Sequence, residues 1–392
     1  MKTIVQINSH INGSTGKIMC SIADEAIKQG YYTYNFFGRG EPKVDGRDIK
    51  FASKLSIYFH ALIGRLGFNG HGSYFATKRL IKQLKSINPD IIHLHNVHGY
   101  YINIKLLFNY LKNDYKGKII WTLHDCWSFT GHCAYFDFVN CNKWAVRCSN
   151  CPQLNHYPKT LLDTTKYEFE FKKKLFSNLN NFYLVTPSLW LSKLVKKSYL
   201  RNYDINVINY GIDTEIFRFY SKTETEELYD KYNLPGDKKI ILGVANVWEE
   251  RKGLKDFIEL ASVLDNKYQI VLVGIDDKNK ANLPHNIISI SRTDNQIELA
   301  KLYSISYVFY NPTYEDNFPT VNLESISCGT PVITYNTGGS PEIIGENGCV
   351  TNKEEFLSDF SNVLKSIKKN KTTTNNNLSS IKMVKEYIEL YK

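Results

Sequence analysis

Short runs of β-branched and aromatic residues alternate with amphipathic stretches along almost the whole chain. Apolar runs bounded by turn residues predict buried strands, and apolar positions three and four residues apart predict helices. In the first half, strands are predicted at Thr3–Ile7, Tyr32–Phe37, Ile91–His95, Lys118–Leu123, Phe182–Pro187 and Ile205–Ile208, and helices at Ile18–Gln29, Thr77–Ser86 and Leu106–Leu111. In the second half, strands are predicted at Lys239–Val244, Gln269–Gly274, Ile287–Ile290, Tyr307–Asn311 and Thr330–Tyr335, and helices at Leu254–Leu264, Ile297–Tyr303, Thr320–Cys328 and Ile381–Tyr391. This alternation is typical of α/β proteins with parallel sheets and helices on both faces.

A chain of 392 residues is too long for one ordinary core, so two α/β domains are expected. We predict an N-terminal Rossmann-like domain over residues 1–208, with a cysteine-rich insertion over about 126–158. A polar, acidic linker region is expected at 209–237, followed by a C-terminal Rossmann-like domain over 238–370. Residues 371–392 are expected to form a flexible stretch and a helix that packs back toward the N-terminal domain.

The net charge of +10 is distributed unevenly. Residues 1–205 carry 28 Lys and Arg against 13 Asp and Glu, whereas residues 206–392 carry 21 against 26. A basic N-terminal half indicates a surface for an anionic partner such as lipid headgroups, a lipid-linked diphosphate or nucleic acid, and a plain solvated surface explains it equally well. An interfacial surface for a lipid-linked acceptor could be formed by an apolar stretch and nearby lysines, and ordinary amphipathic helices packing on the sheet explain them at least as well. These residues are Leu55–Phe68, Lys172, Lys173, Lys174, Lys193, Lys196 and Lys197.

Neither a secretory signal nor an apolar run long enough for a membrane span is found in the sequence. We therefore expect a cytoplasmic protein, with peripheral association with the inner membrane as an option.

The strongest chemical signal lies between Asn311 and Glu342, where a predicted strand ends in an acidic loop. Pro319 has no N–H and suits the first turn of a helix, which leaves the N–H groups of Thr320 and Val321 for a ligand. A helix N-terminus of this kind is a ready site for a diphosphate. One turn further on, Glu324 could accept hydrogen bonds from two ribose hydroxyls.

This segment resembles the retaining glycosyltransferases of the GT-B fold, family four, the glycosyl transferases group 1. The resemblance rests on Glu324, Gly329-Thr330-Pro331 and Gly338-Gly339-Ser340-Pro341-Glu342, and it covers essentially the whole chain. It implies two Rossmann-like domains that face each other across a donor and acceptor cleft. The family's first glutamate is replaced by Asp316, with Glu315 one position earlier, so either carboxylate could lie beside the donor sugar.

The resemblance also implies cations that hold the departing diphosphate, because negative charge builds on it as the sugar–phosphate bond breaks. Arg251 and Lys252, in the loop after a strand, are the candidates, and His124 is the implied histidine near the donor sugar. The catalytic candidates are thus His124, Glu315, Asp316, Arg251 and Lys252. The donor-binding candidates are Gly13, Gly16, Asn246, Arg292, Thr293, Phe318, Pro319, Thr320, Val321, Glu324, Gly338 and Gly339.

Two further groups of residues are of the types that bind metal ions. His93, His95 and His98 share a strand end, where packing and acceptor binding are favoured over a metal site. Cys133, Cys141, Cys148 and Cys151 contain one Cys-x2-Cys pair and could complete a tetrahedral zinc site, with buried or redox-active thiols as the alternative. No catalytic metal is expected, because the chain has no Asp-x-Asp triplet.

We therefore predict a retaining glycosyltransferase that moves a sugar from a UDP- or GDP-sugar to a saccharide carried on polyprenyl diphosphate. The resemblance points to capsule, O-antigen or exopolysaccharide synthesis, with no nucleic-acid partner. Two alternatives stay open at this level: a nucleotide-sugar epimerase of the same fold, and a non-catalytic scaffold that binds sugar or nucleotide.

Overall fold

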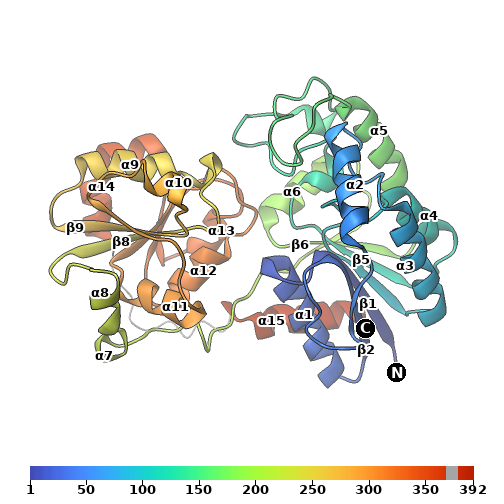
Figure 1. The fold of residues 1–392 in the computed structure, drawn as a ribbon, viewed down its shortest axis with the longest axis horizontal. Helices are drawn as coiled ribbons and strands as arrows, with labels where there is room; N and C mark the ends of the chain where they lie inside the picture. The colour runs from blue at the N-terminus through green and yellow to red at the C-terminus, as the bar shows by residue number, and fades with distance from the viewer. Residues whose placement is uncertain (368–377) are drawn as a thin grey trace. The chain divides into compact units, whose positions relative to one another are not determined.

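The computed structural model describes residues 1–367 and 378–392, which fall into two compact units (Figure 1). Unit 1 comprises Met1–Asn209 and Val384–Lys392, and unit 2 comprises Tyr210–Met383. The flexible stretch expected from residue 371 lies outside the described residues as far as residue 377. Within the described ranges, no helix is both long enough and apolar enough to cross a membrane.

Unit 1 is built on a seven-stranded parallel sheet in the order β3-β2-β1-β4-β5-β6-β7. Its strands are β1 (Thr3–His10), β2 (Tyr32–Arg39), β3 (Asp48–Lys50), β4 (Ile91–Leu94), β5 (Lys118–Thr122), β6 (Phe182–Thr186) and β7 (Asp204–Val207). Its helices are α1 (Gly13–Lys28), α2 (Lys54–Arg65), α3 (Tyr74–Ile87), α4 (Ile104–Asn113), α5 (Thr165–Phe176), α6 (Leu189–Lys197) and most of α15 (Ser380–Tyr391), with 3₁₀ turns η1 (Trp127–Phe129) and η2 (Lys143–Ala145).

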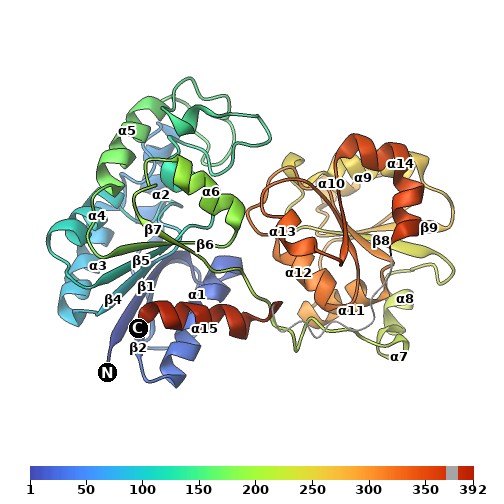
Figure 2. The same cartoon turned by 180° about the vertical axis from the view of Figure 1, so that it is seen from behind.

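Helices cover both faces of this sheet, as Figures 1 and 2 show. Ile92 and Leu94 of β4 belong to the core cluster that also contains Leu80 of α3 and Phe108 of α4. Because successive strand residues point to opposite faces, His93 faces the other side, where it meets α15.

Helix α1 begins at Gly13, five residues before the predicted start at Ile18, so the glycine-rich segment is the first helical turn rather than a loop. Glycine, serine and threonine are tolerated there because the first N–H groups of a helix have no partner within the helix. Gly16 is required by packing, since a Cβ at this position would lie 2.3 Å from the Ile11 carbonyl oxygen.

Unit 2 contains a six-stranded parallel sheet in the order β10-β9-β8-β11-β12-β13. Its strands are β8 (Lys239–Val244), β9 (Tyr268–Val273), β10 (Ile287–Ile290), β11 (Val308–Asn311), β12 (Val332–Tyr335) and β13 (Gly348–Thr351). Its helices are α7 (Lys222–Thr225), α8 (Glu227–Lys231), α9 (Leu254–Val263), α10 (Asp277–Lys280), α11 (Gln296–Ile305), α12 (Thr320–Ser327), α13 (Pro341–Ile344) and α14 (Lys353–Ser366), with the 3₁₀ turn η3 (Glu250–Lys252). Helices α7 and α8 lie in the region expected to be a linker, and the structure assigns them to unit 2.

Alternate residues of β8 show how the sheet of unit 2 divides its core. Leu242 lies in a cluster with Tyr303 of α11 and Ile326 of α12. Ile241, its neighbour in sequence, lies in a separate cluster with Leu260 of α9 and residues of α14. Each unit is therefore a parallel sheet between two helical layers, which is the Rossmann-like architecture.

Candidate active site

In both sheets the strand order reverses direction at one place, between β1 and β4 in unit 1 and between β8 and β11 in unit 2. Ligands of open α/β sheets bind outside the carboxyl ends of the strands at this switch point. The loops that follow β8 and β11 contain Arg251, Lys252, Glu315 and Asp316. The topology thus brings together residues 64 positions apart in sequence.

Lys252 and Asp316 form an ion pair across the switch point of unit 2, with the Lys252 Nζ 2.6 Å from the Asp316 Oδ2. Both side chains are partly accessible, at 21 % and 17 %. Arg251 lies beside them and donates from its Nη1 to the Glu315 carbonyl oxygen at 3.2 Å. Glu315 itself is only 4 % exposed, so Asp316 is the more accessible of the two candidate carboxylates.

Two glycines let these loops approach each other closely. Gly338 has a φ of +55°, and a Cβ there would lie 1.7 Å from the Asp316 carbonyl oxygen. Gly253 has a φ of +75°, and a Cβ there would lie 2.3 Å from the Pro312 carbonyl oxygen. Both positions require glycine on conformational and steric grounds, so they fix the backbone around the Lys252–Asp316 pair.

Helix α12 starts at the same edge of the sheet. Pro319 is its N-cap residue and no side chain caps the first turn, so the N–H groups of Thr320 and Val321 begin the helix. Glu324 lies one turn further on, where its Oε2 accepts a hydrogen bond of 3.3 Å from the Tyr303 hydroxyl. The uncapped start of the helix and the Glu324 carboxylate thus lie one turn apart on the same helix.

The remaining donor-binding candidates of unit 2 occupy different environments. Asn246, after β8, and Arg292, after β10, are exposed, whereas Thr293 is half-buried. Phe318 is 6 % exposed and packs edge-on against Tyr210 in the core, so only its backbone is available to a ligand. Gly339 donates its N–H to the Asp316 carbonyl oxygen at 3.2 Å.

The switch point of unit 1 is lined by residues that follow β4 and β5. A pocket there includes His95, His98, His124 and Asp125. His98 and Asp125 form a pair, with the Nε2 of the histidine 2.9 Å from the Asp125 Oδ2. Tyr157, from the cysteine-rich insertion, places its hydroxyl 2.9 Å from the His98 Nδ1. The sequence indicated Asp125 as a neighbour of His124 but gave no sign of Tyr157, because that contact depends on the path of the insertion.

Five buried side chains form a continuous hydrogen-bonded chain that ends at His124. The Asp48 carboxylate accepts from the Asn35 Nδ2 at 2.8 Å, and the Asn35 Oδ1 accepts from the Gln6 Nε2 at 3.1 Å. The Gln6 Oε1 lies 3.1 Å from the His95 Nε2, and the His95 Nδ1 lies 3.1 Å from the His124 Nε2. An ionised carboxylate can only accept hydrogen bonds, so Asp48 fixes the direction of the whole series. Each member, beginning with His124, donates to the next one toward Asp48.

The pKa values of the residues in this hydrogen-bonded series support the same donor directions. Burial lowers the pKa of His124 well below 6.5 and the neighbouring His95 lowers it further. Burial likewise lowers the pKa of His95, so both rings are neutral. For Asp48, burial alone would raise the pKa, but N–H donors from Asn35 and from the Lys43 and Val44 backbone hold it below its ordinary value.

We expect His124 to be the neutral Nε2–H tautomer at pH 7, because its Nε2–H donates to the bare Nδ1 of His95. Imidazole ¹⁵N chemical shifts of histidine-labelled protein distinguish the two neutral tautomers. Substituting Gln6→Met removes the acceptor that fixes His95 and should produce a mixture of tautomers at both rings. The control Thr122→Val removes a hydroxyl that contacts His93 and Tyr387 but neither His95 nor His124. Finding His124 as the Nδ1–H form in the wild type would refute the assignment.

His93, considered above for a metal or acceptor site, is buried by α15. Its Nδ1 lies 2.6 Å from the Tyr391 hydroxyl, its Nε2 lies 2.8 Å from the Thr122 hydroxyl, and its ring contacts Tyr387. Both nitrogens are therefore engaged in packing the C-terminal helix on the sheet, which rules out metal ligation by His93 in this conformation.

Comparison with known proteins indicates the class of protein that has this fold. The family model for glycosyl transferases group 1 matches residues 224–380, which contain all of the unit 2 candidates. The structure of a sucrose-phosphate synthase from Thermosynechococcus elongatus superposes with a TM-score of 0.70, at 15 % identity, over 100 % of this chain and 98 % of that one.

Two curated relatives extend the comparison. "Putative colanic acid biosynthesis glycosyl transferase WcaC" of Escherichia coli is 24 % identical over 369 residues, which cover 90 % of this chain and 87 % of the relative. The N,N'-diacetylbacillosaminyl-diphospho-undecaprenol alpha-1,3-N-acetylgalactosaminyltransferase of Campylobacter jejuni is 33 % identical over 135 residues, covering 33 % of this chain and 35 % of the relative.

Two Rossmann-like units with these matches define a glycosyltransferase of the GT-B fold. Within that class, residues 224–380 match the model of the glycosyl transferases group 1.

Proposed function

We propose that the protein is a retaining glycosyltransferase of surface-polysaccharide synthesis, which moves a sugar from a UDP- or GDP-sugar to a saccharide carried on a polyprenyl diphosphate. The names of the two relatives support the polysaccharide context and the lipid-linked acceptor. The observation that carries the proposal is the Lys252–Asp316 pair at the unit 2 switch point, beside the N-terminus of α12.

This arrangement suits the departure of a nucleoside diphosphate. The N–H groups that begin α12 would bind the diphosphate, and Glu324 would hold the ribose through its two hydroxyls. Lys252, with Arg251 beside it, would balance the negative charge that grows on the diphosphate as the sugar–phosphate bond breaks. Asp316 would exchange its contact with Lys252 for a hydroxyl of the donor sugar.

Transfer on the same face of the sugar needs no carboxylate nucleophile, because the departing phosphate can take the proton of the acceptor hydroxyl. The protein then contributes position and charge rather than a covalent intermediate. In unit 1, His124 would lie near the donor sugar, with its Nε2–H directed to His95. Gly13 and Gly16, in the first turn of α1, lie at the unit 1 switch point and are proposed to face the donor.

The proposal is tested by measuring sugar transfer directly. Purified protein is incubated with UDP- and GDP-sugars and a short-chain polyprenyl-diphosphate saccharide, and NMR of the product gives the anomeric configuration. We expect one nucleotide-sugar to be used, with the configuration of the donor retained, and the Glu324→Ala variant to lose donor binding. Product formed from the nucleotide-sugar without any acceptor would indicate the epimerase instead, and an inverted product would refute retention.

Helix α2 supports a membrane-proximal acceptor. Only His60 and Gly64 of this helix are buried, while Leu55 is 70 % exposed and Phe59 is 61 % exposed. The expected lysine neighbours need one correction, because Lys172 is 1 % exposed and belongs to the interior. An exposed apolar helix on the basic half of the chain is suited to rest on an anionic lipid surface.

We expect the protein to sediment with vesicles that contain anionic lipid and the Leu55→Glu/Phe59→Glu variant to remain in the supernatant. Each substitution replaces apolar contact by a charge that the anionic surface repels. The variant Val263→Glu changes an apolar residue of unit 2 that is 53 % exposed and serves as the control. If the wild type and both variants sediment equally, α2 does not contact the lipid surface.

A further inference from the structure

The segment between β5 and α5 folds with very little regular structure. Its described secondary structure consists of the two 3₁₀ turns η1 and η2. Even so, it buries large side chains, including Trp127, Phe129, Phe136 and Trp144. A cross-link among its cysteines would help to hold such a segment in one conformation.

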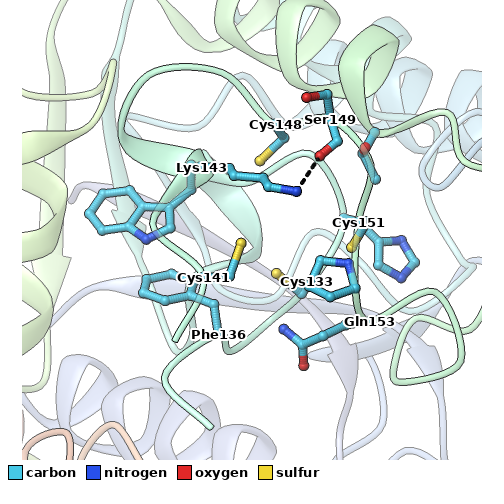
Figure 3. Close-up of a pocket in the computed structure, with 12 residues that line it drawn as sticks. Cys133, Phe136, Cys141, Lys143, Cys148, Ser149, Cys151 and Gln153 are labelled. Carbon is cyan, nitrogen blue, oxygen red and sulfur yellow. Dashed lines mark hydrogen bonds between the residues drawn. The ribbon is translucent and has the colours of Figure 1, made fainter. Parts of the chain in front are cut away.

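Four cysteines of this segment surround one pocket, as Figure 3 shows. They are Cys133, Cys141, Cys148 and Cys151, and the pocket is completed mainly by Phe136, Trp144 and Pro152. None of the four forms a disulfide in the structure. All four thiols therefore lie around the same small cavity, with no covalent link between them.

The short turn between Cys148 and Cys151 places both cysteines of the Cys-x2-Cys pair on the same pocket. Asn150, between the two cysteines, has a φ of +45°. The Gly131 N–H donates to the Cys148 Sγ at 3.2 Å, a hydrogen bond that favours a thiolate over a thiol. The Cys-x2-Cys spacing with two further cysteines is the pattern of a four-thiolate zinc site.

A buried lysine provides the charge that such a site requires. Lys172 is 1 % exposed and its Nζ donates to the Trp127 carbonyl oxygen at 2.7 Å. Its Nζ also lies 3.9 Å from the centre of the Trp127 ring, and the buried Glu168 precedes it by one turn of α5. Four thiolates and Zn²⁺ carry a net charge of about −2, which would compensate this buried cation.

A second lysine lies at the mouth of the pocket. Lys143 donates from its Nζ to the carbonyl oxygens of Ser149 at 3.1 Å and Asn150 at 2.8 Å, in the turn between the two cysteines.

We propose that Cys133, Cys141, Cys148 and Cys151 bind one structural zinc ion. In the structure no three of the described His, Cys, Asp or Glu side chains already converge on a metal position, so binding would draw the four sulfur atoms inward to about 2.3 Å from the metal. The four thiols lose their protons to solvent as Zn²⁺ binds, and no electron is transferred. With four protein ligands the ion has no open position for substrate.

The site would hold the insertion in the conformation that delivers Tyr157 to His98. Its role would be structural, and the inference does not depend on the proposed transfer reaction. The full chain purified without chelator is expected to contain one zinc per chain by elemental analysis. Replacing Zn²⁺ with Co²⁺ should give the intense visible absorption and thiolate charge-transfer bands of tetrahedral sulfur coordination.

Two variants separate ligands from ordinary cysteines. Cys151→Ser should reduce the zinc content to well below one per chain and lower the midpoint of thermal unfolding. Cys349→Ser changes a partly buried cysteine of unit 2 and should retain a full equivalent. Wild-type protein that contains no zinc, takes up no Co²⁺ after reduction, or shows two disulfides by mass spectrometry without reductant would overturn the proposal.

Discussion

Replacing Lys252 by alanine is expected to lower kcat for sugar transfer by about a hundred-fold or more, the loss seen when one preorganised group that stabilises developing charge is removed. In the structure this ammonium pairs with Asp316, so it is held at the switch point before any ligand arrives. The loss should appear mainly in kcat rather than KM, because the charge it balances is largest in the transition state. Steady-state kinetics with the donor identified by the transfer assay measures it.

Lys255→Ala is the matched control for this variant. Lys255 lies three residues further along the chain, is 75 % exposed and pairs with Glu250 at the surface. Its removal should change kcat less than about two-fold, because an exposed pair contributes little. If Lys252→Ala retains a rate within a few-fold of the wild type, Lys252 does not stabilise the leaving group, and Arg251 becomes the candidate to test.

Acidification from pH 7 to about pH 4.5 is expected to unfold unit 1, because several of its histidines are buried in the neutral form. Burial lowers the pKa of His60 to about 3, of His93 to about 3 and of His132 to about 4. Burial also lowers the pKa values of His95 and His124. The unfolded chain binds protons below pH 6.5 while the folded unit does not, so stability is complete above pH 6.5 and falls as the pH drops toward the folded pKa values.

The free energy of unfolding should fall by about 1.4 kcal/mol per pH unit for each such histidine. Over two pH units, five of them can therefore offset a typical free energy of unfolding of about 5–15 kcal/mol. Hydrogen exchange followed by mass spectrometry at several pH values reports each unit separately. Unit 2 contains only His285, which is exposed, and should keep its protection over this range. His93→Gln should reduce the pH slope of unit 1, whereas His285→Gln should leave it unchanged; a slope that His93→Gln does not alter would contradict the linkage.

The strands that flank both switch points were predictable from sequence, because buried parallel strands read as short apolar runs. Predicted and observed bounds agree closely for β8 (Lys239–Val244) and β10 (Ile287–Ile290). Helix α5 was not predicted, although its buried positions follow a helical period. Two of those positions are occupied by Glu168 and Lys172, so the hydropathy pattern does not reveal the buried face.

The candidate donor site could be named from sequence because its members lie in short motifs around Pro319, Glu324 and Gly338. The sequence did not separate Glu315 from Asp316. The structure does so by burial, since Asp316 is accessible and pairs with Lys252 whereas Glu315 is 4 % exposed. That distinction depends on how the β11 loop packs, which local composition does not encode.

The sequence by itself determined that this chain forms two Rossmann-like units and carries the motifs of a glycosyltransferase, since periodicity and motifs are properties of neighbouring residues. Only the tertiary structure decided which distant residues meet. It joined His93 to Tyr391 across 298 positions and connected Asp48 to His124 through three intervening side chains. Such contacts are set by strand order and by the packing of each helix on its sheet, because these bring together residues that no local pattern relates.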